Sequence, residues 1–273
     1  MRTCLRYSIL LAIAATASAE PPPVPLQLAP IPDKLEQGAS CTWRPEQIDL
    51  LEKLNRTDRT HLWDLDDLVE PDYWTGDERD YAPLPRSLEW ARDLDQLIVV
   101  HKPLQAFAAY VRGEMVRWGP VSTGKQATPT PSGLFALNWR SKGHRSSVNR
   151  NWYLPWYFNF NAKTGHAFHQ YALPGLPASH GCVRMLQRDA RWLYGWGREW
   201  TLDQKGWTVT EAGAPVLIIG EYPEVETPPW RDADLLSSGF ALSRQGLWLE
   251  NAAMSLMGGR PKQLVAEATL SAE

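Results

Sequence analysis

The sequence predicts a mainly β domain with one clear helix, flanked by an N-terminal and a C-terminal extension. From residue 97 onward, short apolar segments alternate with turn-forming residues, a pattern typical of strands. One apolar stripe repeats at helical spacing, formed by Leu186, Ala190, Leu193 and Trp200. The chain has 273 residues, of which 44% are hydrophobic and 22% charged, as in ordinary globular proteins. We therefore expect one folded domain from about Leu97 to Tyr222.

The strands of this domain are assigned from the apolar segments and the turns between them. In chain order they are predicted over residues 97–100, 106–111, 115–122, 133–139, 152–160, 207–210 and 216–220. Arg112-Gly113-Glu114 predicts a hairpin turn between the second and third strands. Residues 140–150 are rich in Arg and Lys and are predicted to form a basic loop, either an ordinary solvated loop or a cap over a substrate cleft.

The N-terminus has the pattern of a signal peptide. Arg2 and Arg6 precede the apolar residues 9–15, and Ala17-Ser18-Ala19 is a typical cleavage site. Residues 1–19 are therefore expected to be removed during export to the periplasm. The apolar run is too short for a permanent transmembrane helix, and no later segment is long and apolar enough. We expect an exported protein without a transmembrane anchor.

The two extensions carry less information about chemistry. Residues 20–92 are predicted as a Pro-rich linker, over 20–31, and a small N-terminal extension with a helix over 46–54. The acidic residues between 64 and 80 do not have the spacing of a calcium loop and are expected on a solvated surface. Residues 223–273 are predicted as a C-terminal tail. The formal net charge of −3 does not fit a nucleic-acid partner, because such binders usually carry a strong basic balance.

The segment from His166 to Met185 brings three His, one Cys and one Arg into a short stretch. A thiol is a useful nucleophile only as thiolate, and a neighbouring imidazole can take its proton and return it to a leaving amine. Gly181, directly before Cys182, permits a tight turn that exposes backbone N–H groups, which can stabilise an oxyanion. Pro174-Gly175 predicts a chain reversal that returns from His169 to Cys182. These residues indicate a thiol catalyst of acyl transfer.

The segment Ser179-His180-Gly181-Cys182-Val183-Arg184 closely resembles the core motif of the L,D-transpeptidase (YkuD-type) family. In that family a His precedes the S-H-G-C sequence, and His169 stands in this position. Residues 120–125 and 130–135 look like the family's strand-turn-strand before the active site, and the resemblance covers about residues 96–220. It implies a YkuD-like β-sandwich catalytic domain with short helices, placed here at residues 93–222.

The resemblance also implies a role for each residue of the motif. Cys182 would be the nucleophile and His169 the general base, with its ring oriented by the backbone carbonyl of Gln170. The N–H groups of Gly181 and Cys182 would form an oxyanion hole, and His180 would line the site. Ser179 would brace the loop. Arg184 would bind a substrate carboxylate or hold the loop. Tyr171 is predicted, with Arg184, to bind substrate, and Gln170 to line the site. Gln170 and Tyr171 stand where many members have Gly and a small polar residue, a departure that concerns the choice of acceptor.

The substrate that the resemblance implies is a peptidoglycan stem peptide. Cys182 would attack the carbonyl before the terminal D-Ala of a tetrapeptide stem, typically at diaminopimelate, release D-Ala and form a thioester. An amine of a second stem would then form a crosslink or exchange the terminal residue. Water would instead make the enzyme an L,D-carboxypeptidase or another peptidoglycan hydrolase. The resemblance also implies a carbapenem adduct at Cys182, and neither a cofactor nor a metal.

Three competing interpretations start from the same residues. Cys41 and Cys182 remain after cleavage and would form a disulfide in an exported chain, although a disulfide would abolish the thiolate. His166, His169, His180 and Cys182 would suit a zinc hydrolase if they converged. A strand over residues 165–170 would instead point His166 and His169 to opposite faces. The 14 Trp residues would suit a non-catalytic wall-binding module, but such a module needs neither Cys182 nor His169.

Overall fold

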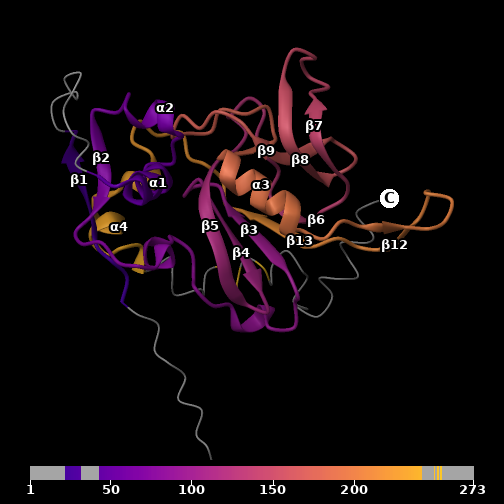
Figure 1. The fold of residues 1–273 in the computed structure, drawn as a ribbon, viewed down its shortest axis with the longest axis horizontal. Helices are drawn as coiled ribbons and strands as arrows, with labels where there is room; N and C mark the ends of the chain where they lie inside the picture. The colour runs from indigo at the N-terminus through magenta and orange to yellow at the C-terminus, as the bar shows by residue number, and fades with distance from the viewer. Residues whose placement is uncertain (1–21, 32–42, 242–248, 250, 252, 254–273) are drawn as a thin grey trace, which may run out of the picture.

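The computed structural model describes residues 22–31, 43–241, 249, 251 and 253, and Figure 1 shows the path of the chain. Its strands are β1 (Leu26–Pro30), β2 (Asp67–Pro71), β3 (Leu97–His101), β4 (Ala106–Val111), β5 (Glu114–Ser122), β6 (Gly133–Ala136), β7 (Arg140–Arg145), β8 (Tyr153–Asn161), β9 (His166–Gln170), β10 (Val183–Met185), β11 (Thr201–Leu202), β12 (Val209–Glu211) and β13 (Pro215–Ile219). Its α-helices are α1 (Pro45–Leu54), α2 (Arg59–Leu62), α3 (Gln187–Trp196) and α4 (Ala233–Ser237). The expectation of a mainly β protein with few helices is confirmed.

A curled nine-stranded sheet forms the centre of the molecule (Figure 1). Its strand order is β6-β13-β3-β4-β5-β10-β9-β8-β7. The pairs β13–β3 and β10–β9 are parallel, whereas the other neighbours are antiparallel. The short strand β10 is therefore inserted between β5 and β9 and joins the two halves of the sheet. Whatever precedes β10 in the chain lies at this junction.

The central strands of the sheet are buried on both faces. On β3, Ile98 and Val100 belong to the apolar cluster that includes α3, while Leu97 and Val99 belong to the cluster that includes α1. A strand covered on both faces has a continuous apolar run, because no side of it meets water. This explains the uninterrupted segment Leu97–Val100 from which the strand was predicted.

Most of the predicted elements are confirmed with small shifts of their ends. The hairpin β4–β5, the aromatic strand β8 and the helix α1 lie where the sequence placed them, and α3 covers the predicted helical stripe except Trp200, because the helix ends at Trp196. The prediction of a basic loop over 140–150 is wrong for its first half, because Arg140–Arg145 is strand β7, antiparallel to β8. β7 is the last strand of the sheet, and charged side chains are common on edge strands, where they discourage pairing with other molecules.

The described parts of both extensions pack into the folded structure. Leu26–Pro30 pairs with Asp67–Pro71 as an antiparallel two-stranded sheet, so this part of the predicted linker is strand β1. Trp230, Leu236 and Phe240, from the predicted C-terminal tail, are buried in the same cluster as Leu26 and as residues of β3 and β4. The physical reason in both cases is apolar burial, which the Pro-rich composition obscured. The N-terminal extension, the nine-stranded sheet and the segment after β13 therefore share one apolar core.

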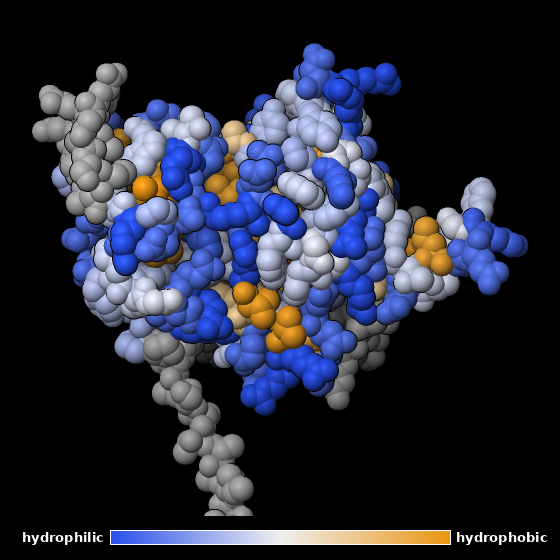
Figure 2. Space-filling model, in the orientation of Figure 1, coloured by the Kyte–Doolittle hydropathy of each residue, from blue (hydrophilic) through white to orange (hydrophobic). Residues whose placement is uncertain are grey.

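The surface of the described residues is mostly polar on the face shown in Figure 2. Figure 2 shows that the face in view is largely hydrophilic, with apolar residues in small separate areas, one of them on the β11–β12 hairpin. In the part of the chain that the structure describes, no helix is long and apolar enough to cross a membrane. The predicted signal peptide, residues 1–19, and Cys41 lie outside the described residues.

Candidate functional site

The residues of the motif meet where β9 and β10 run side by side. The parallel register pairs Phe168 with Val183 and His169 with Arg184. Phe168 and Val183 are fully buried in the core beneath the sheet. Because side chains alternate along a strand, His169 and Arg184 point to the opposite face. There they line one small pocket together with Cys182, which directly precedes β10.

The turn before Cys182 is closed by the side chain of Ser179. Its hydroxyl accepts a hydrogen bond from the Gly181 N–H at 3.1 Å and donates one to the Cys182 carbonyl. Gly181 has φ of 110°, in the region that favours glycine, and a Cβ there would lie 2.4 Å from Nε2 of His166. The sequence therefore needs Ser and Gly at these two positions to present the cysteine.

The Cys182 thiol is free and half-buried. It donates a weak hydrogen bond to the Gly165 carbonyl over 4.0 Å. Burial raises the pKa of the Cys182 thiol, while the Ala167 backbone N–H and the positive charge of Arg184 oppose the shift. Since the net effect is upward, the sulfur is a protonated thiol at neutral pH and needs a base to become a nucleophile.

His169 has the environment of a neutral base. Only 3% of it is exposed, and burial lowers the pKa of His169 to about 4, helped by the nearby charge of Arg184. Its Nδ1 lies 3.0 Å from the Gln170 carbonyl oxygen, the contact that the family resemblance implied. A carbonyl can only accept, so Nδ1 carries the proton and Nε2 keeps its lone pair. The imidazole is thus able to accept a proton at neutral pH.

Arg184 supplies the positive charge of the pocket. Its guanidinium lies over the ring of Tyr171, 4.8 Å from the centroid, and donates to the Ala172 carbonyl at 3.3 Å. These two contacts hold the side chain while leaving other N–H groups of the fork unpaired in the described part of the chain. Holding the loop and binding a carboxylate are therefore compatible roles.

The predicted oxyanion hole needs one correction. The N–H of Gly181 is occupied, because it donates to the Ser179 hydroxyl within the turn. The N–H of Cys182 donates to no acceptor among the described residues. Of the two predicted donors, the turn therefore leaves only the N–H of Cys182 available.

Comparison with known proteins assigns this region. Residues 95–218 match the YkuD family model, the L,D-transpeptidase catalytic domain. This part of the chain is therefore similar to the YkuD catalytic domain. The match spans the whole nine-stranded sheet except the end of β13, and it includes Cys182 and His169. A comparison with curated proteins finds no match.

Several solved structures are similar to the chain over about half its length. One is an L,D-transpeptidase (Yku) from Stackebrandtia nassauensis, with 23% identity and a TM-score of 0.39, covering 49% of this chain and 59% of that chain. Another is an L,D-transpeptidase from Mycobacterium smegmatis, with 20% identity and a TM-score of 0.38, covering 46% and 59%. A third is LdtMt1 in complex with imipenem, with 19% identity and a TM-score of 0.37, covering 56% and 72%. The chain thus spans about three fifths of the first two.

The zinc interpretation finds no support in the geometry. Among the described residues, no group of three or more His, Cys, Asp or Glu side chains could hold a metal ion. His166 lies apart from His169: its Nδ1 is 2.8 Å from the Thr164 hydroxyl, and its ring stacks on Phe160. Its ring lies against Gly181, where it leaves no space for a Cβ in the turn before Cys182.

The motif did not predict the aromatic residues near Cys182 and His180, which are Tyr157 and Trp152. Tyr157, on β8, donates its hydroxyl to the Gly165 carbonyl at 2.9 Å, the same oxygen that the Cys182 thiol faces. Burial raises the pKa of Tyr157 to about 12, and the nearby Cys182 adds to the shift. The ring of Trp152 lies 4.9 Å from that of His180. The density of aromatic residues in 152–160 was visible in the sequence, but its position beside the thiol was not.

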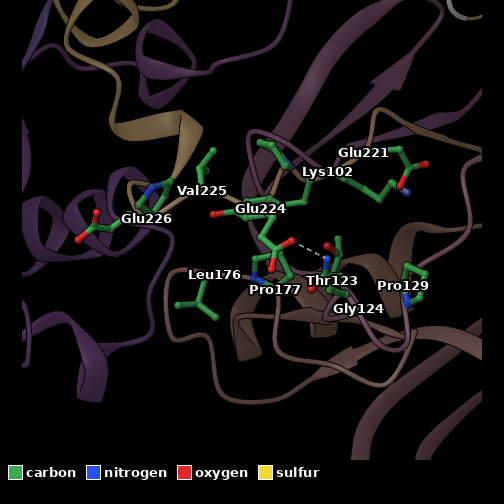
Figure 3. Close-up of a pocket in the computed structure, with 14 residues that line it drawn as sticks. Lys102, Thr123, Gly124, Pro129, Leu176, Pro177, Glu221, Glu224, Val225 and Glu226 are labelled. Atoms are coloured by element: carbon green, nitrogen blue, oxygen red, sulfur yellow. Dashed lines mark hydrogen bonds and ion pairs between the residues drawn. The ribbon is translucent and has the colours of Figure 1, made fainter.

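A larger cavity lies apart from the catalytic pocket (Figure 3). It encloses about 410 Å³, against about 50 Å³ for the pocket at Cys182, and none of the motif residues line it. Figure 3 shows Glu221, beside Lys102, and Glu226 at opposite ends of this cavity. Part of its wall comes from residues 221–228, which follow the matched YkuD region. Its size is that of a ligand site, but Cys182 and His169 line the small pocket instead.

Proposed function

We propose that this chain is a periplasmic cysteine acyltransferase that acts on peptidoglycan stem tetrapeptides through a thioester at Cys182. The observation that carries the proposal is that Cys182 and His169 line one pocket, where the thiol and the imidazole are both neutral. A pair of this kind suits acyl transfer, since the base activates the sulfur only when a substrate is attacked. Similarity to the YkuD catalytic domain supports the same chemistry.

The first half of the reaction forms the thioester. Nε2 of His169 takes the thiol proton as the Cys182 sulfur attacks the carbonyl carbon before the terminal D-Ala. The carbonyl oxygen becomes an oxyanion, which the N–H of Cys182 stabilises by a hydrogen bond. The imidazolium then gives its proton to the departing nitrogen, the C–N bond breaks, and D-Ala leaves as an amine.

The second half of the reaction resolves the thioester. An amine of a second stem attacks the thioester carbonyl and loses a proton to His169. The C–S bond then breaks, and the imidazolium returns the proton to the departing Cys182 sulfur. The product is a crosslink, or a stem with an exchanged terminal residue. Arg184 would bind a carboxylate of the stem, because it lines the same pocket and the described residues leave some of its N–H groups unpaired.

The proposed place of action is the periplasm. Its support is the sequence pattern of residues 1–19, with a basic start, an apolar run and the Ala17-Ser18-Ala19 site. The substrate is a cell-wall peptide, so an exported enzyme meets it directly. N-terminal sequencing of the protein secreted by its host should begin at Glu20, whereas an intact Met1 would contradict the export.

A product assay by mass spectrometry tests the proposed function. The mature protein is incubated with diaminopimelate tetrapeptide muropeptides beside Cys182→Ala and His169→Ala. His61→Ala serves as the matched histidine control, because His61 lies on α2, outside the catalytic pocket. We expect the unmutated protein and the control to make a dimer that has lost one D-Ala, and the two site variants to make none.

Two other outcomes of this assay change the assignment. Tripeptide without dimer would mean that water resolves the thioester, and the enzyme would be an L,D-carboxypeptidase. No turnover by the unmutated protein would refute stem tetrapeptides as substrate. A parallel incubation with a carbapenem should add the mass of the drug to Cys182, and the absence of that adduct would contradict an acylable thiol.

A further inference from the structure

The peptide unit between Gly181 and Cys182 is held from one side only. Its carbonyl, from Gly181, accepts a hydrogen bond from Oγ1 of Thr130 at 2.9 Å. A trans peptide points its carbonyl and its N–H in opposite directions. A bond that anchors the carbonyl toward Thr130 therefore also turns the N–H of Cys182 away from Thr130. Among the described residues, nothing accepts from that N–H.

Thr130 is itself rigidly held. It is fully buried, and its Oγ1 accepts the Gly124 N–H at 2.8 Å. Since a hydroxyl has a single proton, this bond leaves that proton to be donated to the Gly181 carbonyl. The Thr130 carbonyl accepts from Nζ of Lys102 at 2.9 Å, and Lys102 is paired with Glu221 at 2.7 Å. This chain of bonds thus connects Glu221, which lies beyond the matched region, through Lys102 and Thr130 to the turn before Cys182.

The side-chain hydroxyls of Ser179 and Thr130 hold different peptide units of the turn before Cys182. Ser179 holds the peptide units before and after the central one, because it accepts the Gly181 N–H and donates to the Cys182 carbonyl. Thr130 holds the central unit through the Gly181 carbonyl. Together the two side chains bond the Gly181 N–H, the Gly181 carbonyl and the Cys182 carbonyl, and they leave the N–H of Cys182 without an acceptor among the described residues. A donor on the nucleophilic residue itself lies next to the carbonyl carbon that the sulfur attacks.

We propose that Thr130 is a positioning residue that aims the Cys182 N–H at the oxyanion of the reaction, an inference that rests on the proposed acyl transfer. Without its hydroxyl the Gly181–Cys182 peptide unit is free to rotate, and the N–H no longer points where negative charge develops. The sulfur and His169 are untouched by this loss. The effect is therefore specific to reactions that pass through an oxyanion.

Two reactions of the same sulfur separate this role from a structural one. Acylation by p-nitrophenyl acetate passes through a tetrahedral oxyanion, whereas alkylation by iodoacetamide is a direct displacement without one. Both rates are measured in a Cys41→Ala background, so that Cys182 is the reporting thiol of the mature chain. The variants are Thr130→Val, which removes the hydroxyl at nearly constant shape, and Thr130→Ser, which keeps it. Thr123→Val is the matched control, because Thr123 is equally buried and its hydroxyl bonds Gln105 instead.

We expect Thr130→Val to lower the acylation rate constant by about 10²- to 10³-fold, the usual effect of losing one oxyanion donor. Its alkylation rate should stay that of the unmutated protein, and Thr130→Ser should restore acylation. Thr123→Val should leave both rates unchanged. Thr130→Ala repeats the comparison if the Val variant does not fold.

Three results would overturn the positioning role. They are unchanged acylation in Thr130→Val, an equal loss of acylation and alkylation, or acylation of the unmutated protein no faster than that of Cys182→Ala. The proposed substrate fails separately: if stem tetrapeptides are not turned over while acylation by p-nitrophenyl acetate still depends on Thr130, only the substrate is refuted.

Discussion

At the scale of single residues, the site is built from groups that are neutral at rest. Burial raises the pKa of the Cys182 thiol and lowers that of His169 to about 4, so neither is charged at neutral pH. A preformed thiolate–imidazolium pair would require the opposite shifts. In the proposed acyl transfer, activation of the sulfur is therefore coupled to attack, and His169 must be neutral for the reaction to begin.

The pH dependence of acyl transfer follows from these shifts. A protonated imidazole cannot accept the thiol proton, so the rate should hold from neutral pH down to about 5 and fall as the pH drops through the pKa of His169, about 4. The measurement is kcat/KM against pH with the tetrapeptide or p-nitrophenyl acetate. An acid limb centred near the ordinary histidine value, about 6.5, would contradict a buried neutral base.

Alkylation should show a different profile at the same sulfur. Because the pKa of the Cys182 thiol is raised, its thiolate fraction increases only above the ordinary cysteine range, about 8.5. The rate with iodoacetamide in the Cys41→Ala background should therefore still be rising at alkaline pH. A rate that is already constant at neutral pH would mean that the resting sulfur is a thiolate.

At the scale of elements, the junction of β9 and β10 places the nucleophile through a turn that tolerates few changes. Gly181→Ala would put a methyl group 2.4 Å from His166 and force a φ of 110° on a residue with a Cβ. We expect a loss of acylation together with about 1–3 kcal/mol of stability, the usual range for such backbone strain.

Gly195→Ala is the matched control for this change. Gly195 lies in α3 with no atom within 4 Å of its added Cβ, so the variant should keep full activity. It should gain about 0.5–1 kcal/mol from the better helix propensity of alanine. Equal behaviour of the two variants in urea unfolding and in acylation would show that the turn at Gly181 is not under this constraint.

At the scale of the whole molecule, the catalytic domain shares its core with both extensions. Arg56, fully buried, donates to the Leu104 carbonyl and lies over the rings of Trp118 and Trp230. Burial lowers the pKa of Arg56 to about 9. This one side chain thus links the N-terminal extension, the sheet and the C-terminal segment.

The shared core predicts a large difference between two tryptophan variants. Trp230 is 2% exposed and Trp207 is 86% exposed. Trp230→Ala should lower the free energy of unfolding by about 3–5 kcal/mol, as for large buried aromatic residues. Trp207→Ala should change it by less than about 0.5 kcal/mol, as for a surface substitution. A Trp230 variant as stable as the Trp207 variant would mean that residues 223–241 are a tail after all.

The parts of the fold that could be predicted are those with local signals. Strand β3 has a continuous apolar run, and the β4–β5 hairpin has its turn at Arg112-Gly113, where both residues adopt positive φ. Strand β7 was missed because its basic residues pair only with β8, at the edge of the sheet. Strand β1 was missed because its partner β2 is remote in the sequence, and Pro-rich composition is typical of both edge strands and linkers.

The chemistry expected of the turn before Cys182 could be predicted from the sequence alone. The S-H-G-C motif and its upstream His169 are short-range patterns, and they predicted Cys182 as the nucleophile, His169 as the base and the contact of His169 with the Gln170 carbonyl, which the structure contains. The tertiary structure alone decided which N–H is available to an oxyanion, because that depends on Thr130, 51 residues away, and on its bond to Gly181. It also decided that both extensions belong to one core. Hydrogen bonds and apolar contacts between remote segments depend on how the chain folds back on itself, and no local pattern encodes them.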